Sequence, residues 1–189
     1  MNGSPRLRRL QTDYELVKTE FAGHKHIVVE PLAGMPPERY RVTYRVKGLA
    51  LDRKSSQPVV VEKHVAEIYL HSGYPREKPK CELKTPIFHP NFGDYICIGD
   101  HWSAGETLAD IIVKIGEMIQ YRDYNPKSPL NVKAARWSIE NRSHLPVGNV
   151  DLYQPEPEIR IGGAGNDEVE IVFAAKRKPD LDDFEINLK

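Results

Sequence analysis

The stretch that decides the fold runs from Pro86 to Trp102 and reads P-I-F-H-P-N-F-G-D-Y-I-C-I-G-D-H-W. Within it, Cys97 follows the polar turn His89-Pro90-Asn91 and precedes a long segment of apolar periodicity. Cysteine is the most nucleophilic ordinary side chain once it is ionised, so a thiol in this position is a candidate nucleophile. The Asn91 amide offers an uncharged N–H that could stabilise a developing oxyanion. This stretch therefore predicts a reactive thiol with a hydrogen-bond donor nearby.

Downstream of Trp102 the apolar residues adopt the spacing of a helix. Thr107, with Asp110 three residues later, predicts the N-terminal cap of that helix, and we prefer it to Ser103 with Glu106. The chain then breaks at residues 124–129 and suggests a shorter helix over residues 130–141. The apolar members of the longer helix are Leu108, Ile111, Ile112, Ile115, Met118 and Ile119.

Upstream, short strand-like runs follow one amphipathic helix. That helix begins near Pro5 and carries an apolar stripe that could cover a sheet. Consecutive strands with short connections predict an antiparallel meander, and hence an α+β fold with a four-stranded sheet, an N-terminal helix and a long central helix. The four runs are His26–Leu32, Tyr40–Val46, Val59–Leu70 and Cys81–Leu83.

Composition restricts the function classes. The 189 residues carry 27 basic and 27 acidic side chains, a balance that argues against a nucleic-acid or membrane-surface protein. We found no run of about 18 apolar residues and no signal-peptide core, so we expect a cytoplasmic protein. In a reducing cytosol Cys81 and Cys97 are not expected to form a disulfide.

The composition shifts near His144, where Pro and Gly become frequent. We therefore expect a core domain over residues 1–142 and a C-terminal extension over residues 143–189. Alternating pieces at Val169–Phe173 and Phe184–Leu188 suggest that the extension is a small hairpin or a partly mobile tail.

The order of these parts resembles the ubiquitin-conjugating enzymes over roughly residues 5–142. Any one of the short motifs is weak evidence, but six of them occur in the family's order and near its spacing. They are Tyr74-Pro75, Pro79-Lys80, His89-Pro90-Asn91, Cys97, Trp102-Ser103, and Asn125-Pro126 with Pro129-Leu130.

The resemblance implies that Cys97 receives the C-terminal carboxyl of ubiquitin, or of a ubiquitin-like protein, from an activating enzyme as a thioester. It then transfers this acyl group to an amine on a protein substrate, without a metal or an organic cofactor. Asn91 matches the family asparagine that is assigned either to the oxyanion or to ordering the active-site loop. His89 and Pro90 would shape the turn, and Trp102 would pack beneath the loop.

One departure from the family concerns the residue that activates the incoming amine. Ser128 stands where the family often carries an acidic residue that orients or deprotonates the lysine. That role is therefore open, and Asp100 or His101, next to Cys97, is the substitute that we considered.

Other departures concern partners. Arg76 and Ala104 stand where many members carry an aromatic residue and a proline, which argues against docking of a conventional RING-type ligase. Arg6, Arg8 and Arg9 at the start of the first helix are either a solvated face or a docking patch for an acidic partner.

The family's C-terminal helix pair is also curtailed after Asn141. Together these departures resemble prokaryotic relatives encoded beside a ubiquitin-like protein, an activating enzyme and a deubiquitinase. Some of those systems act in defence against phage.

Several other interpretations remain open. Cys97 could be a buried, inert cysteine, as we expect Cys81 to be, or the nucleophile of a cysteine hydrolase. A metal site from Cys97, His89 and His101 lacks a known zinc spacing and a fourth ligand. The main alternative is a non-catalytic module that binds ubiquitin-like proteins, although relatives of that kind typically lack the cysteine.

Overall fold

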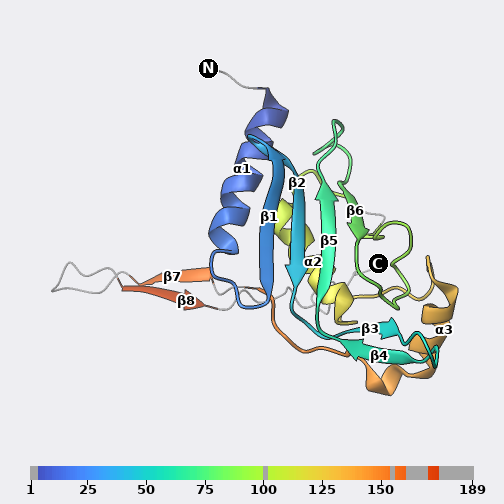
Figure 1. Ribbon diagram of the computed structural model, residues 1–189. Coiled ribbons are helices and arrows are strands. Elements are labelled where there is room, and N and C mark those ends of the chain that lie inside the picture. Colours follow the sequence, from blue (N-terminus) through green and yellow to red (C-terminus); the bar gives the residue numbers. More distant parts are fainter. Residues whose placement is uncertain (1–3, 100–101, 154–155, 161–169, 175–189) are drawn as a thin grey trace, which may run out of the picture. The chain divides into compact units, whose positions relative to one another are not determined.

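The computed structural model describes residues 4–99, 102–153, 156–160 and 170–174 (Figure 1). The chain divides into two compact units, Met1–Leu152 and Tyr153–Lys189. The packed core extends past residue 142, where we expected it to end, because the side chain of Leu152 is fully buried. The division into a catalytic domain and an extension stays a prediction.

A four-stranded antiparallel sheet organises the first unit, and the predicted meander is confirmed. Its order is β1 (Ile27–Gly34), β2 (Pro37–Tyr44), β5 (His64–Tyr69) and β6 (Lys80–Leu83).

The prediction of one strand over Val59–Leu70 was wrong. Two exposed charged residues, Glu62 and Lys63, interrupt this run. The part before them forms β4 (Pro58–Val61), which pairs with β3 (Gly48–Leu51) in a separate hairpin. Only the part after them, β5, joins the main sheet.

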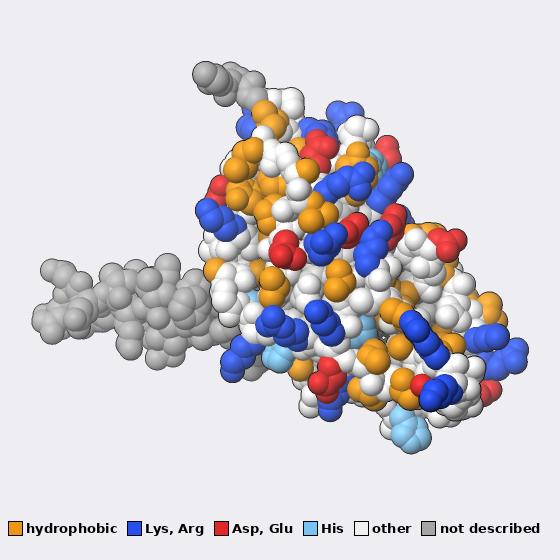
Figure 2. All heavy atoms as spheres, in the orientation of Figure 1, with side chains coloured by type: hydrophobic (Ala, Val, Ile, Leu, Met, Phe, Trp, Pro, Cys, Tyr) orange, Lys and Arg blue, Asp and Glu red, His pale blue; other side chains and the backbone are white. Residues whose placement is uncertain are grey.

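The two faces of the sheet differ in their surroundings. The alternating residues Tyr40, Val42 and Tyr44 are fully buried, and the hydroxyl of Tyr44 donates to the carbonyl of Ile112 in α2 (Leu108–Ile119) at 2.9 Å. In Figure 1, α2 lies behind the strands of the sheet, and α1 (Pro5–Glu20) lies alongside β1 at the left. The opposite face carries charged side chains of both signs, which Figure 2 shows scattered across it.

A buried carboxylate connects three segments of this unit. Asp13, in α1, is completely buried and pairs with Arg9 at 2.8 Å. It also accepts hydrogen bonds from the Tyr74 hydroxyl at 2.6 Å and from the Leu108 backbone N–H at 3.1 Å. Because a buried charge is costly unless it is paired and hydrogen-bonded, these bonds fix α1, the Tyr74 turn and the start of α2 together.

The helix ends follow the capping chemistry read from the sequence. Thr107 and Asp110 form the predicted capping box at the start of α2. The helix expected over residues 130–141 corresponds to α3 (Val132–Glu140), which Asn131 caps. The short 3-10 helix η1 (Arg142–His144) follows it. Among the described residues, no helix combines the length and apolar character that crossing a membrane requires.

The described residues of the second unit include a hairpin. Strands β7 (Glu156–Arg160) and β8 (Glu170–Ala174) pair in antiparallel fashion, with Arg160 opposite Glu170. The expected strand at Val169–Phe173 therefore corresponds to β8, and the piece at Phe184–Leu188 lies outside the described residues.

His89 is buried in an aromatic cluster with Phe92 and Tyr121. Its ring centroid lies 4.8 Å from that of Phe92 and 4.4 Å from that of Tyr121. Nδ1 accepts the Asn91 backbone N–H at 3.1 Å, so the proton of the neutral ring is on Nε2. Burial lowers the pKa of His89 to about 3, because a charged imidazolium would lose its hydration there.

This burial predicts a loss of stability in mild acid. The folded state holds His89 neutral, whereas the unfolded chain binds a proton below its ordinary pKa of 6.5, so stability falls as the pH drops below that value. By pH 5 the loss from this residue is about 2 kcal/mol. Urea unfolding at pH 7.5 and pH 5 should therefore show a smaller pH effect in His89→Phe than in the wild type. His144→Gln, at an exposed histidine, should keep the wild-type effect, and equal pH effects in all three proteins would contradict the assignment.

Candidate active site

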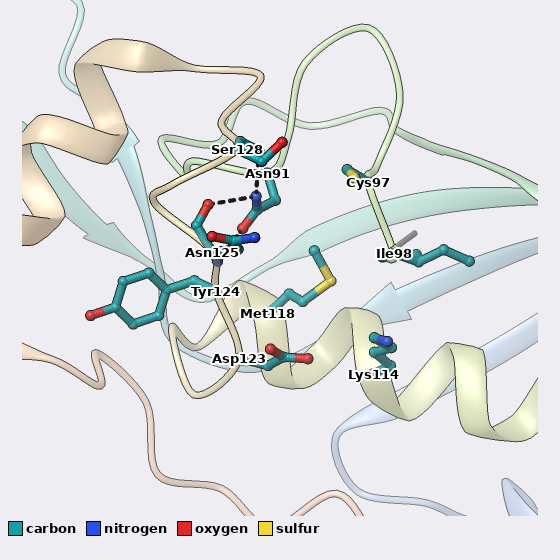
Figure 3. Close-up of a pocket in the computed structure, with 10 residues that line it drawn as sticks. Asn91, Cys97, Ile98, Lys114, Met118, Asp123, Tyr124, Asn125 and Ser128 are labelled. Carbon is teal, nitrogen blue, oxygen red and sulfur yellow. Dashed lines mark hydrogen bonds between the residues drawn. The ribbon is translucent and has the colours of Figure 1, made fainter. Parts of the chain in front are cut away.

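Cys97 lies half-buried at the edge of a pocket of about 300 Å³ (Figure 3). Backbone hydrogen bonds of Cys97 and of the preceding residue, Ile96, hold it in place. Its N–H donates to the carbonyl of Asn91 at 2.9 Å, and the N–H of Ile96 donates to the carbonyl of Cys81 in β6 at 2.8 Å. The pocket is lined by Asn91, Cys97, Ile98, Gly99, Lys114, Met118, Asp123, Tyr124, Asn125 and Ser128.

The second cysteine has a different environment. Cys81 is only 2% exposed, and burial raises the pKa of its thiol to about 12. A thiol that is neither ionised nor accessible is a poor nucleophile at neutral pH. Of the two sulfurs, Cys97 is the one that a substrate could reach.

The side chain of Asn91 connects the Cys97 loop to the segment after α2. Its Nδ2 donates to the carbonyl of Asn125 at 2.9 Å and to that of Ser128 at 3.4 Å, while its Oδ1 accepts the Asn125 backbone N–H at 2.7 Å (Figure 3). Both amide hydrogens are therefore engaged. Of the two roles that the resemblance left open for Asn91, this geometry supports ordering of the loop.

The neighbouring residues strengthen the same connection. The carbonyl of Pro90 accepts the backbone N–H groups of Leu130 and Asn131 at 2.8 and 2.9 Å. Together with the buried ring of His89, these bonds fix the turn that precedes Cys97. These contacts support the turn-shaping role that the resemblance implied for His89 and Pro90, which stays a prediction.

Of the other predicted site residues, one lines the pocket, one packs away from it, and two lie outside the described residues. Ser128 is exposed and lines the pocket. Trp102 packs on the turn at Tyr74 and Pro75: its Nε1 donates to the Pro75 carbonyl at 2.8 Å, and its ring centroid lies 5.9 Å from that of Tyr74. Asp100 and His101 lie outside the described residues.

Two of the arginines expected in a docking patch have partners within the protein. Arg6 pairs with Glu38 at 2.8 Å and donates to the carbonyl of Leu70 at 2.9 Å. Arg9 binds Asp13, the Tyr74 hydroxyl and the carbonyls of Ala104 and Glu106. These contacts give Arg6 and Arg9 a structural role.

Arg8 and Arg76 have exposed side chains, and Ala104 is also exposed. Arg9 contacts Ala104, and Trp102 contacts Pro75, the residue before Arg76. Ala104 and Arg76 therefore both lie near the Tyr74 turn. Recognition of a partner by Arg6, Arg8, Arg9, Arg76 or Ala104 stays a prediction.

Two charged residues of the pocket escaped the sequence analysis. Lys114 is half-buried on α2, and Asp123 is half-buried just beyond the end of that helix. Neither side chain has a hydrogen bond or an ion pair with another described residue. A signal for Lys114 was available, because it is a single cation within the apolar sequence I-I-V-K-I-G.

The backbone that follows Cys97 is also held by a charge. Lys78 donates from Nζ to the carbonyl of Gly99 at 2.9 Å, and Gly99 has a φ of 111°, a conformation that favours glycine. Across residues 4–99 and 102–153, no group of three or more His, Cys, Asp or Glu side chains is arranged to hold a metal ion.

Comparisons with known proteins show which family and which fold this chain resembles. Residues 58–146 match the family model described as ubiquitin-conjugating enzyme. A solved structure titled "Novel Ubiquitin-Conjugating Enzyme" superposes with a TM-score of 0.53, covering 74% of this chain and 88% of that chain. At 22% identity this likeness shows the fold alone, and it confirms the predicted α+β architecture.

Curated relatives come from two fungi and a plant. Ubiquitin-conjugating enzyme E2 16 of Schizosaccharomyces pombe is 33% identical over 78 residues, which cover 38% of this chain and 48% of the relative. Ubiquitin-conjugating enzyme E2 13 of Saccharomyces cerevisiae is 26% identical over 61% of this chain and 77% of the relative. Ubiquitin-conjugating enzyme E2 27 of Arabidopsis thaliana is 31% identical over 40% of this chain and 41% of the relative.

The match therefore spans about half the length of the first of these relatives. The residues matched by the family model, 58–146, contain Asn91, Cys97 and the loop that Asn91 holds. The family model, the relatives and the fold agree in one respect: residues 58–146 of this chain match the ubiquitin-conjugating enzymes.

Proposed function

We propose that this protein carries ubiquitin, or a ubiquitin-like protein, as a thioester on Cys97 and transfers it to an amine of a protein substrate. An activating enzyme would supply the acyl group. The observation that carries the proposal is the contrast between the two thiols of this chain: Cys97 opens to a pocket, whereas Cys81 is buried.

The site suits this chemistry because a thioester is already activated toward amines. The protein need only hold the acyl group, position the amine and stabilise the charge that develops. We infer that Asn91 contributes by fixing the loops on both sides of the pocket, since its amide hydrogens are bound to the carbonyls of Asn125 and Ser128.

Asp123 is our candidate for the residue that receives the incoming amine. The neutral hydroxyl of Ser128 cannot bind and deprotonate an ammonium as a carboxylate would. Asp123 lines the same pocket as Cys97, and its side chain has no partner among the described residues. A carboxylate there can bind an incoming ammonium and accept its proton as the amine attacks.

The alternative function is a non-catalytic module that binds ubiquitin-like proteins. It needs neither a reachable thiol nor a pocket beside it, so the placement of Cys97 favours the carrier. Cytoplasmic location, independence from a RING-type ligase, prokaryotic origin and a role in phage defence stay predictions. The relatives reported above come from fungi and a plant.

The carrier function predicts a specific covalent adduct. When the protein is incubated with ubiquitin, ATP and a ubiquitin-activating enzyme, it should gain a ubiquitin adduct that thiol reductant removes. Cys97→Ser should give an oxygen ester that resists the reductant, because its hydroxyl can form only that bond, and Cys97→Ala should give none. Gel mobility with and without reductant measures all three.

Cys81→Ala is the matched control and should load like the wild type, because Cys81 is buried. A reductant-sensitive adduct that persists in Cys97→Ala contradicts the assignment of the thiol. Absence of any wild-type adduct, when a conventional conjugating enzyme loads in the same mixture, contradicts ubiquitin as the cargo.

The role of Asp123 predicts a defect confined to the second step. Asp123→Asn should form the Cys97 adduct normally but discharge it to free L-lysine roughly 10- to 100-fold more slowly at pH 7. The defect should shrink as the pH rises, since more of the lysine is then unprotonated. Single-turnover discharge measures the rate.

Asp94→Asn, at an exposed position outside the pocket lining, should discharge like the wild type. An Asp123→Asn rate equal to the wild type at every pH would remove Asp123 from this role.

A further inference from the structure

The pocket lacks a free hydrogen-bond donor at the position where the family resemblance suggested one. Both amide hydrogens of Asn91 are donated to loop carbonyls, and its side chain is only 4% exposed. Releasing either hydrogen toward an oxyanion would break a bond that ties Asn91 to the loop after α2, which costs free energy. The negative charge that develops during acyl transfer therefore needs another partner.

Lys114 is the cation that the structure places in this pocket. It is half-buried on α2, next to residues Val113 and Ile115, which are buried, and it lines the pocket with Cys97. Its Nζ lies 3.5 Å from the position that a Cβ of Gly99 would occupy. The ammonium thus lies against the backbone two residues after the thiol, on a helix fixed by its packing.

The charge of Lys114 is not neutralised by the pocket's own carboxylate. Lys114 and Asp123 line the same cavity, yet no ion pair joins them, and neither has another partner within the described residues (Figure 3). A second cation nearby, Lys78, donates a hydrogen bond to the carbonyl of Gly99. A half-buried ammonium interacts with nearby charge more strongly than one in bulk water.

We propose that Lys114 is a further catalytic residue, whose ammonium stabilises the negative charge formed as the thioester on Cys97 is attacked. This inference rests on the proposed carrier function. The amine nitrogen forms a bond to the acyl carbon, and the carbonyl electron pair moves onto oxygen to give an oxyanion. The oxyanion then re-forms the carbonyl, the carbon–sulfur bond breaks, Cys97 leaves as a thiolate, and the nitrogen loses its proton to Asp123 or water. Lys114 compensates first the oxyanion and then the thiolate.

The test uses a small acyl donor, so that no activating enzyme is required. Full-length protein is acylated at Cys97 by exchange with an acetyl-Gly-Gly thioester, the excess is removed, and discharge to L-lysine is followed by intact mass spectrometry. Lys114→Met keeps the length of the side chain but removes the charge, and should discharge about 10- to 100-fold more slowly. Lys114→Arg keeps the charge and should stay within about threefold of the wild type. Lys127→Met, at an exposed lysine outside the pocket lining, should equal the wild type.

The possible outcomes separate this inference from the function on which it rests. If wild-type Cys97 accepts no acyl group, the carrier function itself fails. If Cys97 is acylated and Lys114→Met discharges at the wild-type rate, the carrier stands and the role of Lys114 is overturned. It is also overturned if Lys114→Arg is as slow as Lys114→Met, or if the acyl group is found on the nitrogen of Lys114. That last result would make the residue an acceptor.

Discussion

The side-chain amide of Asn91 is the constraint on which the geometry around the thiol depends. Its three hydrogen bonds hold the segment after α2, and its backbone carbonyl receives the N–H of Cys97. One residue therefore sets the distance between the loop that carries the sulfur and the loop that forms the opposite side of the pocket. An amide suits this position, because it donates and accepts at once and carries no charge that burial would penalise. The same saturation is why we propose that Asn91 orders the loops and that other groups stabilise the developing charge.

The helix α2 lies between this site and a second polar anchor. At its start, the buried carboxylate of Asp13 binds the N–H of Leu108, the hydroxyl of Tyr74 and the guanidinium of Arg9. Just beyond its end, the hydroxyl of Tyr121 donates to the carbonyl of Phe88, one residue before the turn that Asn91 completes. Between these anchors the helix is almost entirely buried, so Lys114 is presented to the pocket from a rigid support. Polar bonds fix the ends of the helix, and apolar packing fixes its middle.

Local patterns in the sequence were sufficient for most of the fold. The capping box at Thr107 and the alternation through Tyr40–Val46 each depend on residues close in the chain. The motifs around Cys97 were identified through their resemblance to a family, and their contacts reach residues about 30 positions away. The failures came from long-range effects. The run Val59–Leu70 looks like one strand, because nothing local reveals that Val59–Val61 pairs back onto β3. Arg6 and Arg9 look like a surface patch, because all of their partners except Asp13 lie about 30 to 100 residues away in sequence. Asp123 enters the site only because the chain turns back toward Asn91 after α2.

The claim that ties these observations together is that Cys97 is the reachable sulfur and that it holds the acyl group. Alkylation by iodoacetamide, followed by peptide mass mapping, tests it directly on the folded protein. We expect Cys97 to be labelled in the free protein and protected after reaction with ubiquitin, ATP and an activating enzyme, while Cys81 stays unlabelled in both samples. A Cys97 that resists labelling in the folded free protein, or that is labelled equally after the adduct has formed, would contradict this account.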